Sequence, residues 1–170
     1  MVRVKDVLAA EKTALDWGKW EDRQMPTTAF PLSKRRQHSF RLGSAYRWRI
    51  VRFRACDCQF RLLLAFSIAK EQYRATLALE GERDMSVLAS YEFHGTHPGW
   101  HLSATCADIF AVPQGVMIGP WQRRLPRARS FHRHTKFRVT SDDIALTIAA
   151  DFFRLHATGG TLPLRRALGG

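Results

Sequence analysis

Apolar and polar residues alternate through the middle third of the chain with the period of β-strands. Four such runs follow one another: residues 46–55, 60–68, 73–79 and 87–93. In the first run the apolar positions change parity between Ile50 and Val51, which predicts a strand that contains one β-bulge. Only short, turn-like sequences separate the runs. The pattern therefore predicts an antiparallel meander of about four strands.

Apolar residues take up a helical spacing on either side of this region. Residues 4–17 show it over a short stretch near the N-terminus. Residues 142–156 show it directly after Ser141, which is followed by two aspartates in the manner of a helix start. We therefore expect an α+β fold, in which an N-terminal helix and a C-terminal helix flank the meander.

The length of 170 residues suits one domain with a sizeable core. After the meander, proline and glycine become frequent and periodicity fades, apart from a short strand-like run at residues 136–139. Function is expected in this part, because loops commonly carry functional residues. The predicted divisions of the single domain are a helix plus basic linker (1–44), the β-meander (45–93), a loop-rich basic rim (94–140), a helix (141–158) and a tail (159–170).

The chain is strongly basic. Its 27 Lys and Arg residues against 15 Asp and Glu residues give a formal net charge of +12, which favours a polyanionic partner. The longest apolar run, Leu62 to Phe66, is far shorter than the roughly 20 residues of a membrane helix. No signal-peptide pattern opens the sequence, so we expect a cytoplasmic protein with no membrane partner. The odd number of cysteines, three, favours reduced thiols in a bacterial-type cytoplasm.

A basic segment lies between Gln122 and Arg138, with seven basic residues and no acidic residue. Clustered cations bind phosphates by releasing counterions, and nearby aromatic rings can stack on single-stranded bases. We therefore predict nucleic acid as the partner, although a solvated charged surface would have the same composition. The predicted contacts are Arg123, Arg124, Arg127, Arg129, Arg133 and Lys136, with Trp121 or Trp100 as the stacking ring.

Four side chains that zinc accepts as ligands, His94, His97, His101 and Cys106, lie close together in the sequence. A zinc site is one interpretation. The other is a tight surface turn whose histidines form ordinary hydrogen bonds. The spacing does not match the paired ligands of structural zinc sites, so we assign no metal ligands and no cofactor.

Metal-independent ribonuclease chemistry is a further alternative for the histidines. One imidazole would remove the 2′-hydroxyl proton, a second would protonate the leaving oxygen, and an arginine would neutralise the charge that develops on the phosphate. A histidine from residues 94–101 would pair with one from the basic segment, His132 or His134.

Cys106 is also a candidate nucleophile, because nearby imidazoles and arginines favour a thiolate. After a helix and a four-stranded meander, the order His97-Pro98, Cys106-Ala-Asp108-Ile109 and Trp121 resembles that of ubiquitin-conjugating enzymes. The resemblance implies that Cys106 would carry a thioester, that His97 would shape the preceding turn, and that the partner would be a protein. The Asn of the family's His-Pro-Asn triplet is Gly99 here. Whether the protein is an enzyme stays open; the candidate catalytic residues are Cys106, His97, His101, His94 and Asp108.

Overall fold

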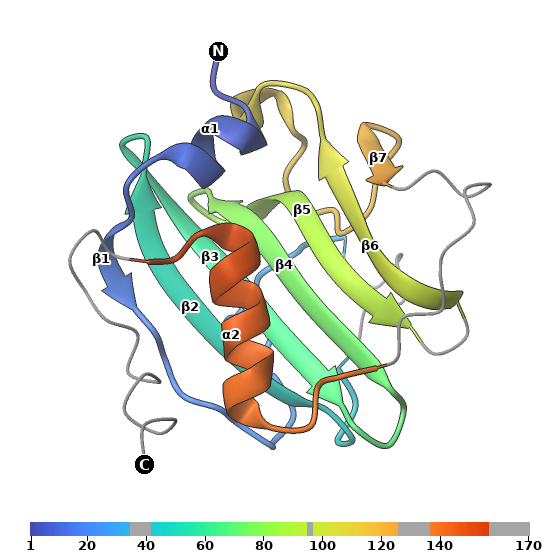
Figure 1. The fold of residues 1–170 in the computed structure, drawn as a ribbon. Coiled ribbons are helices and arrows are strands. Elements are labelled where there is room, and N and C mark those ends of the chain that lie inside the picture. Colours follow the sequence, from blue (N-terminus) through green and yellow to red (C-terminus); the bar gives the residue numbers. More distant parts are fainter. Residues whose placement is uncertain (35–41, 95–96, 126–136, 157–170) are drawn as a thin grey trace.

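Seven antiparallel strands form one sheet in the computed structural model, which describes residues 1–34, 42–94, 97–125 and 137–156 (Figure 1). Each strand pairs with the next one along the chain, so the sheet is a simple meander. The α+β prediction is confirmed, and the predicted count of about four strands is corrected to seven. The strands are β1 (Thr13–Asp16), β2 (Arg47–Ala55), β3 (Cys58–Ser67), β4 (Gln72–Glu80), β5 (Met85–His94), β6 (His97–Thr105) and β7 (Gln122–Leu125).

The two predicted helices are both present. Helix α1 spans Val4–Ala9 and is shorter than predicted, because the chain becomes extended at Ala10 and continues into β1. Helix α2 spans Asp142–Phe153, and the Ser141 hydroxyl accepts a hydrogen bond from the Ile144 amide, as the N-cap pattern predicted. In the described parts of the chain, no helix has the length and apolar character needed to cross a bilayer.

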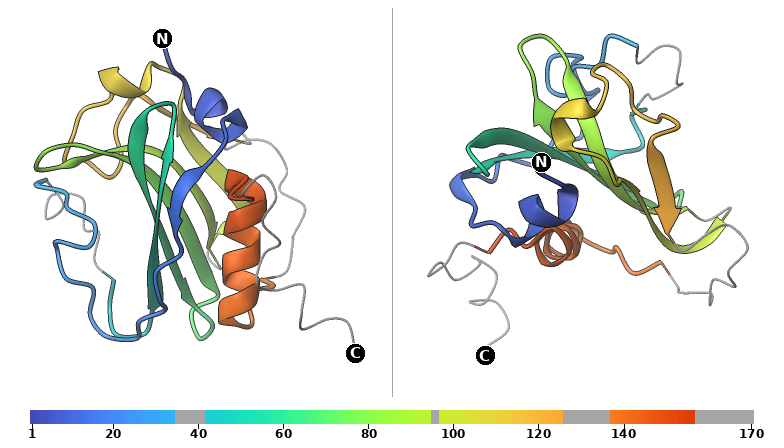
Figure 2. Two further views of the ribbon diagram at one scale, coloured as in Figure 1. Left: turned by 90° about the vertical axis from the view of Figure 1, so that its left-hand side faces the viewer. Right: turned by 90° about the horizontal axis from the view of Figure 1, so that it is seen from above.

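The predicted bulge in the first long strand is wrong. β2 pairs with β3 in unbroken register from Arg47↔Phe66 to Ala55↔Cys58. The parity of the apolar residues changes because both faces of the sheet are covered: Ile50 packs on one face and Val51 on the other. Helix α2 lies against the face that carries Val51 (Figure 2). The opposite face is covered at β2 and β3 by apolar residues from the segment between β1 and β2 and from the segment after β6, among them Phe30 and Met117.

Part of the region predicted as a loop-rich rim is regular structure. It contains β6, β7 and a short 3₁₀ helix, η2, over Ile109–Ala111. The short strand predicted at residues 136–139 is not observed among those of its residues that the structure describes, 137–139. β6 was missed because it begins with His97-Pro98-Gly99, which reads as a turn when the sequence is considered alone.

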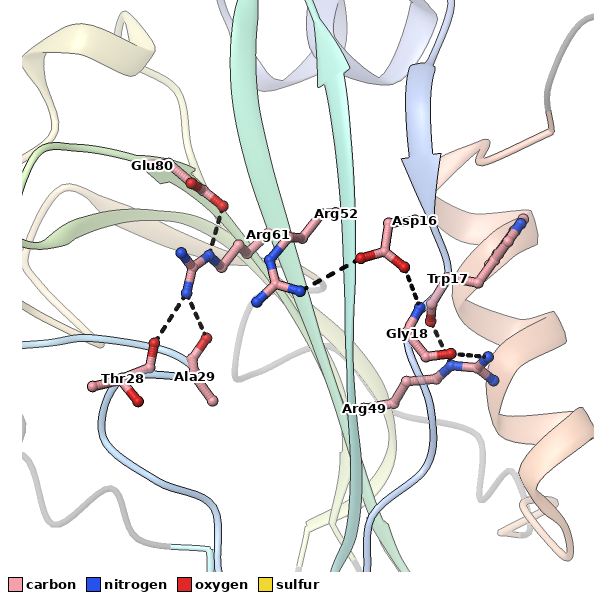
Figure 3. A network of polar contacts seen from close by, with 9 residues as sticks. All are labelled: Asp16, Trp17, Gly18, Thr28, Ala29, Arg49, Arg52, Arg61 and Glu80. Atoms are coloured by element: carbon pink, nitrogen blue, oxygen red, sulfur yellow. Dashed lines mark hydrogen bonds and ion pairs between the residues drawn. The ribbon is translucent and has the colours of Figure 1, made fainter.

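Arginines of β2 and β3 fasten the N-terminal segment to the sheet (Figure 3). Arg49 donates hydrogen bonds of 2.6 and 2.8 Å to the carbonyls of Trp17 and Gly18. Arg61 pairs with Glu80 at 2.6 Å and also donates to backbone carbonyls of the N-terminal segment. Glycine is required at position 18, since φ is +61° and a Cβ would lie 2.2 Å from the Ile50 carbonyl oxygen. Arg49 and Arg61 therefore stabilise the fold by holding the N-terminal segment against the sheet.

Candidate functional site

A row of polar side chains runs across β4, β5 and β6 on the face of the sheet turned away from α2. The β-ladder pairs Arg74 of β4 with Glu92 of β5, and Glu92 with His101 of β6. Paired residues on neighbouring strands point to the same side of a sheet, so the three side chains share one face. Their sequence neighbours point the other way: Tyr91, for example, stacks on Phe152 of α2 at 4.0 Å between ring centroids.

Glu92 lies at the centre of this row, and its two carboxylate oxygens have different partners. Oε1 accepts a hydrogen bond of 2.6 Å from the Ser90 hydroxyl and lies 2.9 Å from Arg74 Nε. Oε2 lies 2.7 Å from His94 Nε2 and 3.5 Å from His101 Nε2. The residue is only 8% exposed. Four side chains thus converge on one buried carboxylate.

These contacts keep the Glu92 carboxylate ionised. Burial by itself would raise its pKa, because a charge is poorly solvated in the interior. The contacts with His101 and His94, the positive charge of Arg74 and the hydrogen bond from Ser90 outweigh burial. The pKa of Glu92 is therefore held well below its usual range.

The two histidines come from neighbouring strands and lie nearly parallel. Their ring centroids are 5.2 Å apart, with 27° between the ring planes. A register shift between Phe93 and His94 adjusts the end of β5 beside the site. His101 is 6% exposed, and its Nδ1 atom has no hydrogen-bond partner among the described residues. Among those residues, Glu92, His94 and His101 form the group that could hold a metal ion, with one ligand atom from each within 4.8 Å of the others.

The structure brings together two of the predicted site residues, His94 and His101. The backbone of His97 pairs with His94 in the ladder, but its side chain lies outside the described part of the structure. Cys106 is exposed and follows the far end of β6, roughly 16 Å along the chain from His101 at the rise of a β-strand. Asp108 caps η2 by accepting a hydrogen bond from the Phe110 amide. Cys106 and Asp108 therefore do not join the histidines.

The predicted nucleic-acid contacts are only partly described. Arg123 and Arg124 lie on the edge strand β7, where Arg123 is exposed and Arg124 is half-buried. Arg124 pairs with Ser103, two residues from His101, so it points to the same face of the sheet as the histidines. Trp121 and Trp100 are half-buried and pack against the core on the α2 side. Residues outside the described part of the chain are Arg127, Arg129, Arg133, Lys136, His132 and His134.

Sequence reasoning missed Glu92, which organises the site. The signal was present as a second alternation inside the same strand: Ser90, Glu92 and His94 occupy every other position between the apolar residues. In such a strand the apolar residues fill one face of the sheet and the polar residues between them lie on the other face. When that other face is also covered, the polar residues form a buried row.

The resemblance to ubiquitin-conjugating enzymes rested on the order of His97-Pro98 and Cys106. In the structure, His97 and Pro98 begin β6 and are strand residues, and Cys106 follows that strand. Comparison with protein-family models, with curated proteins and with solved structures finds no match to this chain.

Proposed function

We propose that the protein binds nucleic acid along the β6–β7 edge of the sheet. The observation that carries this proposal is the difference between two groups of arginines. On β2, Arg47 forms a bidentate pair with Asp142 at 2.7 and 2.8 Å and Arg52 lies 3.6 Å from Asp16, while the exposed Arg54 has no ion-pair partner among the described residues. On β7, neither Arg123 nor Arg124 has an ion-pair partner in the described ranges; Arg123 is exposed and open to phosphates, whereas Arg124 is half-buried and its Nε atom lies in the interior.

The position of β7 adds to this argument. It is an edge strand, paired only with β6 among the described strands, and it leads directly into residues 126–136, which hold four further Lys and Arg residues and no acidic residue. Clustered cations release counterions when they meet a phosphate backbone, which supplies sequence-independent affinity. The expected ligand is therefore RNA or DNA bound mainly through its backbone.

Fluorescence anisotropy with short single-stranded and duplex oligonucleotides at two salt concentrations tests the proposal. Reversing both β7 charges, Arg123→Glu with Arg124→Glu, should weaken binding at low salt about tenfold or more and flatten the salt dependence by about one unit per residue. The matched control is Arg52→Glu with Arg54→Glu, which makes the same change of charge at two exposed positions of β2. Equal losses in both double variants, or binding that does not respond to salt, would reject a β7 interface.

Binding is favoured over cleavage by the arrangement of the histidines. General acid and base groups must each reach a proton of the substrate. In the structure the Nε2 atoms of His94 and His101 both face Glu92. The thioester chemistry of the alternative stays a prediction; Cys106 is exposed, but it lies at the other end of β6 from the histidines that face Glu92.

A further inference from the structure

We propose that Glu92, His94 and His101 bind one divalent transition-metal ion, of which Zn²⁺ is the simplest case, through Glu92 Oε2 and the two imidazole Nε2 atoms. This site is independent of the β7 interface. Two imidazoles and one carboxylate form a ligand set that suits zinc and similar ions, whereas Mg²⁺ and Ca²⁺ prefer oxygen ligands alone.

The Glu92 carboxylate suits this role because its two oxygens have different partners. Ser90 and Arg74 bind Oε1, which leaves Oε2 facing the two histidines. Metal-binding carboxylates are commonly held by hydrogen bonds of this kind, which fix the orientation of the ligand oxygen. Arg74 therefore lies on the side of the carboxylate away from the proposed ion.

The distances from Glu92 Oε2 to the two imidazole nitrogens lie on either side of what a tetrahedral ion needs. Ligands at 2.0–2.1 Å from zinc lie about 3.3 Å from one another. In the structure, Oε2 is 3.5 Å from His101 Nε2, near this value, and 2.7 Å from His94 Nε2. Binding thus requires the His94 ring to move outward by roughly half an ångström. Its side chain is 25% exposed, so the movement is open to it and the ion has a route in.

The burial of His101 also supports a bound metal ion. An imidazole taken out of water loses two hydrogen bonds, and each buried polar atom without a partner costs free energy. His101 has only the 3.5 Å contact at Nε2 and no partner for Nδ1 in the described parts of the chain. Hydrogen bonding therefore compensates its burial poorly, whereas a metal–nitrogen bond at Nε2 would compensate it well. Three protein ligands leave a fourth position for water or for an exchangeable ligand.

Titration of the chelator-treated, full-length protein with Co²⁺, followed by visible absorption, and with Zn²⁺, followed by calorimetry, tests the proposal. One ion should bind per chain, with the visible bands of a four-coordinate Co²⁺ site. His94→Gln and His101→Gln should each lower the affinity about 100-fold or more. Ser90→Ala, which removes only a support of the carboxylate, should lower it about tenfold.

Two control variants separate this site from other ligands. His156→Gln changes an exposed histidine that lies 3.3 Å from Asp151, and Cys106→Ser removes the thiol that the sequence placed among the zinc ligands. Both should bind the ion as the unchanged protein does. Absence of stoichiometric binding, or equal affinity in His94→Gln, would overturn the proposal; so would thiolate-to-cobalt absorption that is lost in Cys106→Ser. His94→Gln is the decisive variant, because its side chain is partly exposed and its replacement should disturb the fold less than that of the buried His101.

Discussion

Replacing Glu92 with glutamine is expected to lower the free energy of unfolding by about 3–5 kcal/mol, the cost of removing one partner from a buried ionic network. The amide cannot accept hydrogen bonds at both of its terminal atoms. It would leave part of Arg74, Ser90, His94 or His101 without an acceptor in the interior. Urea unfolding of the metal-free protein, followed by circular dichroism, measures the loss.

Glu80→Gln is the matched control for this substitution. Glu80 lies on the neighbouring strand β4, and Arg61 pairs with it at 2.6 Å, but both side chains are partly exposed. The loss there should stay near 1 kcal/mol, as for ion pairs that water can reach. Equal losses at the two positions would mean that Glu92 is one ordinary ion-pair partner and not the centre of the polar row.

The same network predicts how stability depends on pH. The pKa of Glu92 is held far below its usual value in the folded protein, by the hydrogen bonds and the charge that outweigh burial. An unfolded chain would protonate this carboxyl near pH 4.3. The stabilisation is therefore fully present above that pH and is lost progressively as the pH falls toward the folded-state pKa. Acid unfolding curves of metal-free Glu92→Gln should lack this contribution and fall less steeply below about pH 4.3.

Phe153→Ala is expected to cost about 3–5 kcal/mol, because it removes a buried aromatic ring and leaves a cavity between α2 and the sheet. Phe153 is 1% exposed and ends the helix. Ile144→Ala, near the exposed start of the same helix, should cost less than about 1 kcal/mol. Urea denaturation of both variants checks the difference. A small effect at Phe153 would show that α2 is not packed on this face.

The parts of the fold that the sequence predicted are the long elements rich in apolar residues. Strands β2 to β5 have nine or ten residues each, and α2 has both a cap and an apolar repeat. The missed strands β1 and β7 have four residues each and lie at the two edges of the sheet. Edge strands of this length carry too few buried positions to establish an alternation, so only tertiary pairing defines them.

The candidate site was predicted in part for a related reason. Residue type identifies His94 and His101 as candidates, but six residues separate them in the sequence. They meet because β5 and β6 are adjacent, and β6 was not predicted as a strand. Cys106 was grouped with them because it is near in sequence; an extended strand instead carries it away from the histidines. The distance between two residues along the chain therefore says little about their distance in space when the residues between them form a strand.

The contact of Glu92 Oε2 with both histidines underlies everything inferred about the polar row. A long-range ¹H–¹⁵N correlation spectrum of the histidine rings, recorded on the metal-free protein at mildly alkaline pH, shows which ring nitrogen carries the proton. His94 and His101 should both be protonated at Nε2, the atom that faces the carboxylate. Protonation of either ring at Nδ1 alone would contradict the assignment of Glu92 as their common partner.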